Sequence, residues 1–195
     1  MDDLDAIRLY PVILGSTTVP EYAHIYAQDK LDMIVSQYWL GSTDIEGRFV
    51  ITLNAVEVTK SYTPTQPVMV AVTLSPTLYI GDAETGTLFS SYSLPMVKGA
   101  GTNENKAYIQ AIRSINVQSP AVSRFIEQSK LKIVDFYSSQ VDVVMARVDA
   151  LVSNGEFDNA LSVLASIPIC SKEAYILAET KMVSVYKQKI DAAGL

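Results

Sequence analysis

Charged side chains are scarce in this 195-residue chain, and the basic ones are not clustered. Asp, Glu, Lys and Arg make up 18% of the residues, against about 25% in an average soluble domain. The 15 Lys and Arg residues are outnumbered by 21 Asp and Glu residues, which gives a formal net charge of −6. Proteins that neutralise nucleic-acid phosphates need grouped basic residues. We therefore predict no direct binding to nucleic acid.

Cysteine and histidine each occur once, as Cys170 and His24. One cysteine excludes an internal disulfide and a cysteine metal cluster, and Cys170 is expected to be a small buried apolar residue. No apolar run approaches the ~20 residues that cross a membrane, so no membrane association is predicted. The first residues, MDDLDAIRLYPVIL, are acidic, whereas a signal peptide begins with a positive region. We expect the protein to be made in a cytoplasm and to stay there, or in a particle assembled there.

Hydrophobic residues, in contrast, make up 49% of the chain. A monomer of this size needs polar side chains to cover its surface, so the shortage of charge indicates that other subunits cover part of it. The alternative is a well-packed monomer whose surface is rich in Ser and Thr. Either way, 195 residues suffice for one or two small domains with a buried core.

Strands are predicted over four stretches, residues 7–14, 48–60, 68–80 and 87–97. The second and third alternate apolar and polar residues with the period of two that is typical of a strand. Short polar links join the last three, which predicts an antiparallel meander. Pro76 interrupts the third near its end, and Pro11 places the first at an edge or a bulge.

Two helices are predicted beside this sheet. Pro20 suits the first turn of a helix that runs to about Tyr38. Gly99-Ala100-Gly101 is expected to break the last strand in a flexible turn, and Thr102 or Asn103 then caps a second helix.

The composition changes after Ile115, because helical spacing continues from Ser119-Pro120 almost to the end. Asn154-Gly155 is a helix C-cap signal, and Ser171 caps the last helix, whose apolar side is predicted to carry Tyr175, Met182, Val183 and Tyr186. We predict two domains, 1–117 and 118–195. The fold class is α+β: an N-terminal α/β sandwich in the order β-α-β-β-β-α with a mostly antiparallel sheet, followed by an all-helical bundle or hairpin.

The first predicted helix is apolar on two sides, although a surface helix needs only one apolar face. Tyr22, Ile25, Tyr26 and Met33 occupy one side, and Leu31, Ile34, Val35 and Tyr38 the other. The second apolar side therefore predicts a neighbouring domain or subunit. Because aromatic side chains anchor many protein interfaces, we expect interface residues among Tyr22, Tyr26, Tyr38 and Trp39.

Residues with catalytic or ligand-binding potential have simpler structural interpretations. Gly99 and Gly101 precede a helix, where anions bind, but they lack the third glycine and the Lys-Ser/Thr of a phosphate loop. His24 pairs with Glu21 at metal-ligand spacing, yet a matching second pair is missing. Asp82 and Glu84 lie where a turn is expected. We predict no enzyme activity, no cofactor, no metal and no small-molecule substrate.

The segment Asn154–Leu161, NGEFDNAL, resembles the inter-helix turn of a tetratricopeptide hairpin. In that interpretation Gly155 allows the turn, Phe157 fills the hairpin core and Ala160 allows the helices to approach closely. The Trp and Leu-Gly signature of the family is absent and no second copy follows. The resemblance implies one helical hairpin for packing or docking.

The α/β part, about residues 5–115, resembles small domains of curli-secretion and Tol-type envelope lipoproteins. The shared features are a strand with Phe89-Ser90-Ser91, then Val97-Lys98-Gly99-x-Gly101, then a helix with Ala107 and Ala111. Those families build rings and envelope complexes and are not enzymes. We expect this chain to depart from them, with neither a signal peptide nor a lipidation cysteine.

Residues Val97–Tyr137, which include KGAGTNENKAYIQAIRSIN and FIEQSKLKIVDFY, resemble virion proteins of crAss-like tailed phages, in particular the ring proteins between portal and tail. This resemblance implies a structural subunit of a virion assembled in the host cytoplasm. Its partners would be further copies of itself, in a ring homo-oligomer, and neighbouring tail proteins. The alternative is a cytoplasmic or envelope-type adaptor that binds one protein through its helical hairpin.

Overall fold

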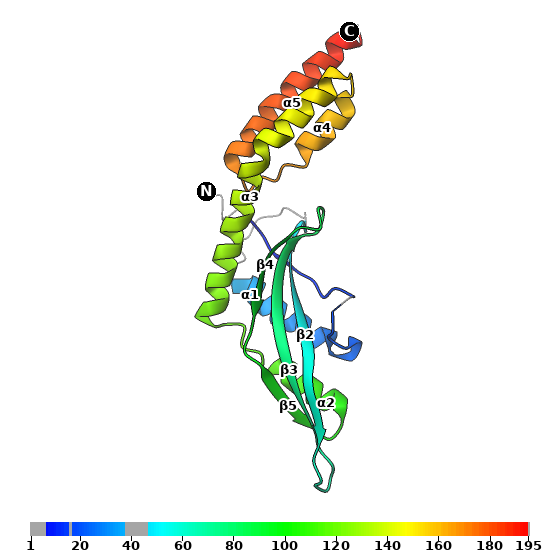
Figure 1. Cartoon of the computed structure of the whole chain (residues 1–195), viewed down its shortest axis with the longest axis vertical. Helices are drawn as coiled ribbons and strands as arrows, with labels where there is room; N and C mark the ends of the chain where they lie inside the picture. The colour runs from blue at the N-terminus through cyan, green and yellow to red at the C-terminus, as the bar shows by residue number, and fades with distance from the viewer. Residues whose placement is uncertain (1–6, 16, 38–46, 195) are drawn as a thin grey trace. The chain divides into compact units, whose positions relative to one another are not determined.

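The computed structural model describes residues 7–15, 17–37 and 47–194. It confirms the predicted α+β class, with a five-stranded mixed sheet in the N-terminal part and helices in the C-terminal part (Figure 1). The elements in chain order are β1 (Tyr10–Pro11), the 3-10 helix η2 (Glu21–Ala23), α1 (His24–Gln37), β2 (Phe49–Tyr62), β3 (Val70–Asp82), β4 (Leu88–Ser93), β5 (Val97–Gly101), α2 (Glu104–Arg113), α3 (Pro120–Ser153), α4 (Phe157–Ala165) and α5 (Lys172–Ala192).

The chain divides into two compact units. Arg8–Ser129 form the first, which we call the sheet unit, and the residues from Lys130 onward form most of the second, the helical unit. The division falls inside α3, so this helix begins in one unit and continues in the other. The predicted boundary at residues 117/118 lies in the link just before α3.

The sheet has the order β1-β2-β3-β4, and β5 pairs with the other half of β3. β1 is parallel to β2, and all other pairs are antiparallel. Two expectations differ from this arrangement. The strand predicted over 7–14 is a strand only at Tyr10–Pro11. The strand predicted over 87–97 is in fact two strands, β4 and β5, on the same edge of β3.

Pro76 explains why this edge is divided. It lies within β3, opposite Ala55 of β2, and its carbonyl accepts a hydrogen bond from the N–H of Leu94 at 2.9 Å. In an antiparallel ladder the N–H and C=O of one residue point to the same edge. The missing N–H of Pro76 therefore faces the interval between β4 and β5, where a continuous partner strand would need it. The predicted interruption at Pro76 is wrong for β3, which continues through this residue, and the neighbouring strand is interrupted instead.

One face of the sheet carries the core of this unit. β3 alternates buried and half-buried residues along its whole length, and α1 and α2 cover the buried side (Figure 1). The large side chains of the sheet that are almost completely buried are Ile51, Leu53, Leu74, Leu78 and Ile80. The alternation seen in the sequence thus has its expected cause, the burial of one face of an antiparallel sheet.

Gly99 and Gly101 lie in β5 and form no turn, which corrects the sequence interpretation. A Cβ on Gly99 would lie 2.0 Å from the carbonyl oxygen of Ala107 and 2.4 Å from the backbone nitrogen of Ala111. A Cβ on Gly101 would lie 2.7 Å from the backbone nitrogen of Ala107. Only glycine lets the backbone of α2 approach this strand so closely, so the two residues serve helix–strand packing.

The helical unit has its own core, formed by residues of α3, α4 and α5 and the link between the last two. Its buried members are Val148, Ala160, Leu164, Ile167, Ala174, Ala178 and Val185. Gly155 ends α3 with a φ of +78°, and the two hydrogen bonds that follow, Gly155 N–H to Val152 and Glu156 N–H to Leu151, form a Schellman motif. Ala160 is completely buried and Phe157 is half-buried.

Candidate interaction surfaces

The first candidate surface is the side of η2 and α1 that points away from the core, which we call the α1 outer face. It consists of Tyr22, Ile25, Tyr26 and Met33, the apolar side chains at helical spacing around Asp29. Ile25 is 65% exposed, and Tyr22 and Met33 are also exposed. The opposite side of the helix, with Ala27, Leu31, Ile34 and Val35, is buried. The predicted two-sided helix is therefore present, with only one apolar side covered.

Tyr22 and Tyr26, the two described tyrosines of this face, each contact a neighbouring side chain. The ring of Tyr22 meets that of Tyr108 edge-on at a centroid distance of 6.4 Å. The guanidinium of Arg113 lies 4.5 Å from the centroid of the Tyr26 ring. These contacts fix both rings with part of their surface exposed, which lowers the entropy lost when such a ring enters an interface. Tyr38 and Trp39, the other predicted interface residues, lie outside the described residues.

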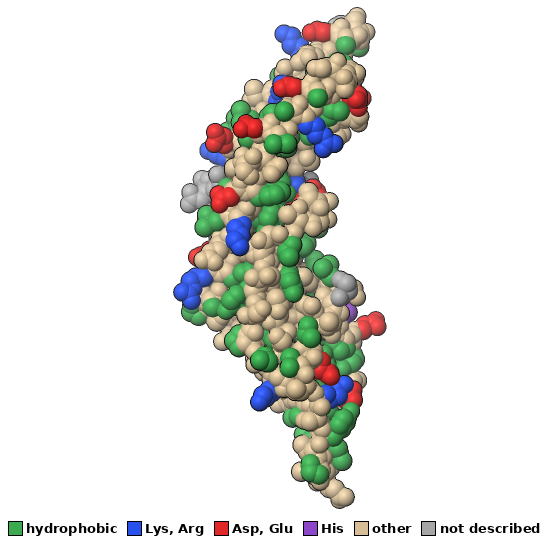
Figure 2. All heavy atoms as spheres, in the orientation of Figure 1, with side chains coloured by type: hydrophobic (Ala, Val, Ile, Leu, Met, Phe, Trp, Pro, Cys, Tyr) green, Lys and Arg blue, Asp and Glu red, His purple; other side chains and the backbone are tan. Residues whose placement is uncertain are grey.

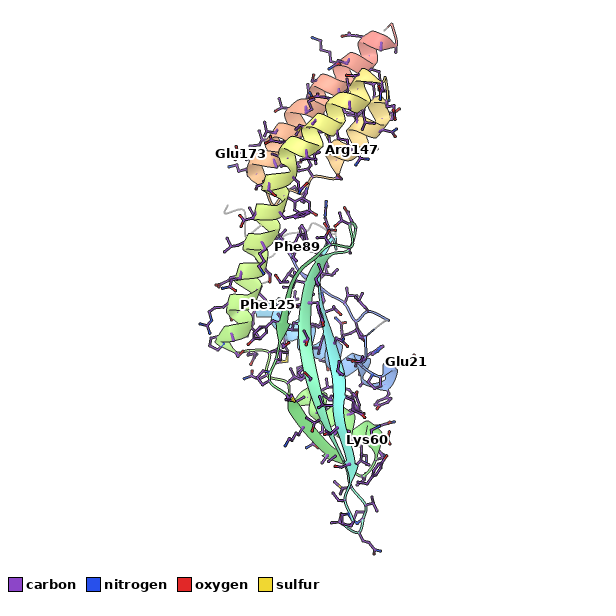
Figure 3. All side chains as sticks on the ribbon, in the orientation of Figure 1. Glu21, Lys60, Phe89, Phe125, Arg147 and Glu173 are labelled. Atoms are coloured by element: carbon purple, nitrogen blue, oxygen red, sulfur yellow. The ribbon has the colours of Figure 1, made fainter. Side chains whose placement is uncertain are left out.

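A polar network lies beside this face, where β2 passes the start of α2. The Tyr62 hydroxyl donates to Glu104 at 2.5 Å, and Lys60 pairs with Glu104 at 3.2 Å and with Glu57 at 3.3 Å. Figure 3 labels Lys60 at this end of β2. The hydrogen bond from Tyr62, followed by the bond from Lys60, lowers the pKa of Glu104. Burial and the nearby Glu104 carboxylate raise the pKa of Tyr22. The network therefore adds fixed charge next to an apolar face.

Local sequence patterns do not predict this network, because its members are far apart in the chain. Tyr62 and Glu104 are separated by 42 residues. The one local indication of this network is Glu104, an acidic residue in the first turn of α2, because the N-terminal end of a helix favours a negative charge. Asn103, one of the two residues predicted to cap α2, is its N-cap and accepts a hydrogen bond from the Lys106 N–H at 2.9 Å.

The second candidate surface lies on α5, and we call it the α5 outer face. Its members are Ile176, Val183, Tyr186 and Ile190, all exposed, with Val183 at 71%. Ala174, Ala178 and Val185 form the buried side of the same helix. Hydrophobic side chains are visible among charged ones on the surface of the helical unit (Figure 2).

This arrangement corrects the predicted apolar side of the last helix. Tyr175 and Met182 are half-buried, but Val183 and Tyr186 point to solvent. The core side of α5 uses two alanines, because small side chains let α4 and α5 approach closely. The predicted apolar side favoured large side chains and therefore included Val183 and Tyr186, which belong to the α5 outer face.

The residues considered for chemistry have structural roles. The His24 ring nitrogen lies 2.8 Å from the carbonyl oxygen of Val19. Asp82 is buried, pairs with Arg48 at 2.8 Å, and accepts the N–H groups of Glu84 and Thr85 in the predicted turn. Within the described residues, no three or more His, Cys, Asp or Glu side chains are grouped to hold a metal ion. No described helix combines the length and the apolarity needed to cross a membrane.

No family model and no curated protein sequence matches the chain. Among solved structures, it aligns with a predicted lipoprotein from Caulobacter crescentus CB15 at 13% identity, over 67% of this chain and 88% of that chain. The TM-score of that alignment is 0.31. A similarity at this level carries no argument about fold or function.

Proposed function

We propose that this protein is a non-enzymatic structural subunit of a large symmetric assembly, namely a ring of the neck or tail of a tailed phage, between portal and tail. It acts in the virion after assembly in the host cytoplasm, and its partners are other copies of itself and neighbouring tail proteins. The proposal requires no cofactor and no small-molecule substrate.

The observation that carries the proposal is the α1 outer face. Tyr22, Ile25 and Met33 are exposed on the side of the helix opposite to the core, next to the contact between Tyr26 and Arg113. A helix that packs on a sheet through one face needs no apolar residues on the other. Apolar and aromatic residues gathered on a surface favour a protein partner.

His24 and Asp82, which were considered for chemistry, have partners that suit a structural role. His24 is bonded to the backbone, and Asp82 holds a turn together with Arg48. A ring needs a head-to-tail contact that closes on itself. In this proposal the α1 outer face is one side of that contact, and the helical unit contacts neighbouring proteins. The assignment to a phage virion rests on the resemblance of residues 97–137 to crAss-like ring proteins.

Light scattering after gel filtration, combined with negative-stain microscopy, tests the assembly. The full chain is expected to form a higher oligomer, and Ile25→Lys is expected to reduce it to small species with unchanged circular dichroism. Leu88→Lys is the matched control, since Leu88 is a similarly exposed apolar residue, at 60%, on β4 of the same unit. A wild-type chain that stays monomeric at high concentration would overturn the proposal. Equal loss of assembly in the Ile25→Lys and Leu88→Lys variants would show that the ring contact does not specifically involve the α1 outer face.

The virion assignment has a separate test. Quantitative mass spectrometry of gradient-purified particles from the source of the gene is expected to find the chain in many copies per particle. Absence of the chain from such particles would refute the phage role while leaving the ring assembly to be judged by light scattering.

A further inference from the structure

We propose that α5 binds a second copy of this chain as an antiparallel, two-fold symmetric helix pair, in which the two Val183 side chains meet on the symmetry axis. The surface involved is the α5 outer face, which is distinct from the α1 outer face on which the proposed function rests. The occupant is a second α5, as the spacing, exposure and charge of the residues along this one helix indicate.

The apolar residues of the α5 outer face form a narrow straight line. Ile176, Val183 and Ile190 recur every seven residues, and Tyr186 lies on the adjacent turn. A seven-residue repeat drifts by only ~20° per two turns, so these side chains stay on one side over four turns of helix. β-branched residues at such positions are typical of helix–helix seams. All four side chains are exposed on the side opposite the buried Ala178 and Val185.

The charged residues beside this line would face residues of opposite charge on a second, antiparallel α5. With Val183 on the axis, a residue a given number of positions before Val183 faces the residue the same number after it. Ile176 then faces Ile190 of the second copy, seven positions away on either side, and Glu179 faces Lys187, four positions away on either side. The symmetry makes each pair twice, so the seam gains two ion pairs along with its apolar contacts.

The parallel alternative is unfavourable for the same residues. In a parallel pair in register, Glu179 would face Glu179 and Lys187 would face Lys187, which places like charges together on both sides of Val183. In the antiparallel pair Lys172 also comes to lie beside the end of the second α5, where the helix carbonyls favour a cation. Two further lysines of α5 already have partners inside the helical unit: Lys181 pairs with Asp149, and Lys189 pairs with Asp158.

Glu179 has a polar neighbour in its own helix. Tyr175 lies one turn earlier, and its interaction with the Glu179 carboxylate raises the pKa of the Tyr175 hydroxyl. A carboxylate accepts more than one hydrogen bond, so this neighbour leaves Glu179 able to accept from a lysine. An exposed pair of this kind stabilises little by itself, and its effect is to select register and direction.

Cysteine cross-linking of the full chain tests the seam. Val183→Cys is expected to give a covalent dimer on mild oxidation, because the two sulfurs lie across the axis. Gln188→Cys, an exposed residue on another side of the same helix, is the matched control and is expected to give none. The native Cys170 is buried and serves as an internal control in the wild type. Equal cross-linking at positions 183 and 188 would overturn the proposal.

A charge exchange tests direction and register. In the Ile25→Lys background, which removes the contact of the proposed ring, we expect a dimer by analytical ultracentrifugation. Glu179→Lys and Lys187→Glu should each weaken this dimer by at least tenfold, and the double variant should restore it. A dimer that is indifferent to both single changes, or a monomer in the Ile25→Lys background, would refute the α5 pair. These outcomes leave the ring contact untouched, so the two proposals fail separately.

Discussion

Replacing Gly99 with alanine tests the close packing of α2 on β5. The added Cβ would lie 2.0 Å from the Ala107 carbonyl oxygen and 2.4 Å from the Ala111 nitrogen. An ordinary contact begins near 3.4 Å, so the helix or the strand would have to move by about 1 Å or more. Both clashing atoms belong to the backbone of α2, and no side-chain rotation relieves them. Ala107, Ala111 and Ile112 would lose their contacts with the sheet.

Overpacking of this kind destabilises by about 1–3 kcal/mol, and we expect about 3 kcal/mol for Gly99→Ala because rigid backbone is displaced. With a urea m-value of about 2 kcal/mol/M, the unfolding midpoint should fall by ~1.5 M. Amide hydrogen exchange should accelerate most in α2. Gly15→Ala is the control, since nothing lies within 4 Å of its added Cβ, and its effect should stay within about 0.5 kcal/mol. Indistinguishable midpoints for the two variants would refute the packing argument.

Three further substitutions test local features of both units. Gly155→Ala should cost about 1 kcal/mol in thermal unfolding, because its φ of +78° is strained for a residue with a Cβ. Tyr62→Phe should raise the lowered pKa of Glu104 toward its ordinary value in an NMR titration. Wild type should therefore lose the stabilisation from Glu104 as pH falls through that lowered pKa, and the variant should show less of this loss. Arg48→Met should cost about 3 kcal/mol in urea unfolding, because the carboxylate of Asp82 stays buried without this cation.

Local periodicity made much of the fold predictable. The alternation in β2 and β3, the Asn103 cap of α2 and the Gly155 end of α3 all depend on residues close in sequence. They predict a strand pair, a helix start and a helix end, and the structure has each of them. Where one face of an element must be buried, the pattern of that element carries the information.

The features that were wrong or missed depend on which elements become neighbours. The function of Gly99 is set by the backbone of α2, eight or more residues away, and a glycine before a helix reads equally well as a turn. The division of β4 from β5 follows from Pro76, which lies in a different strand. The bond between Tyr62 and Glu104 joins two elements that the sequence gives no reason to align. Periodicity shows which sides of a helix are apolar. Where a helix has two apolar sides, as α5 does, periodicity does not show which of them faces the core.

The two proposed contacts have different symmetry. Because of this difference, we expect the α5 pair to form before the ring and to separate when the ring assembles. A head-to-tail contact through the α1 outer face builds a ring with a direction along its axis. A phage tail has such a direction, from portal to tip, whereas an antiparallel α5 pair reverses it. In the proposed tail, subunits joined through α5 could not stack in one direction, so we expect the α5 pair in the free protein. We expect oxidised Val183→Cys dimers to fail to enter rings until a reductant separates them. Rings that incorporate the cross-linked dimer at the wild-type rate would show that the α5 pair persists in the assembly.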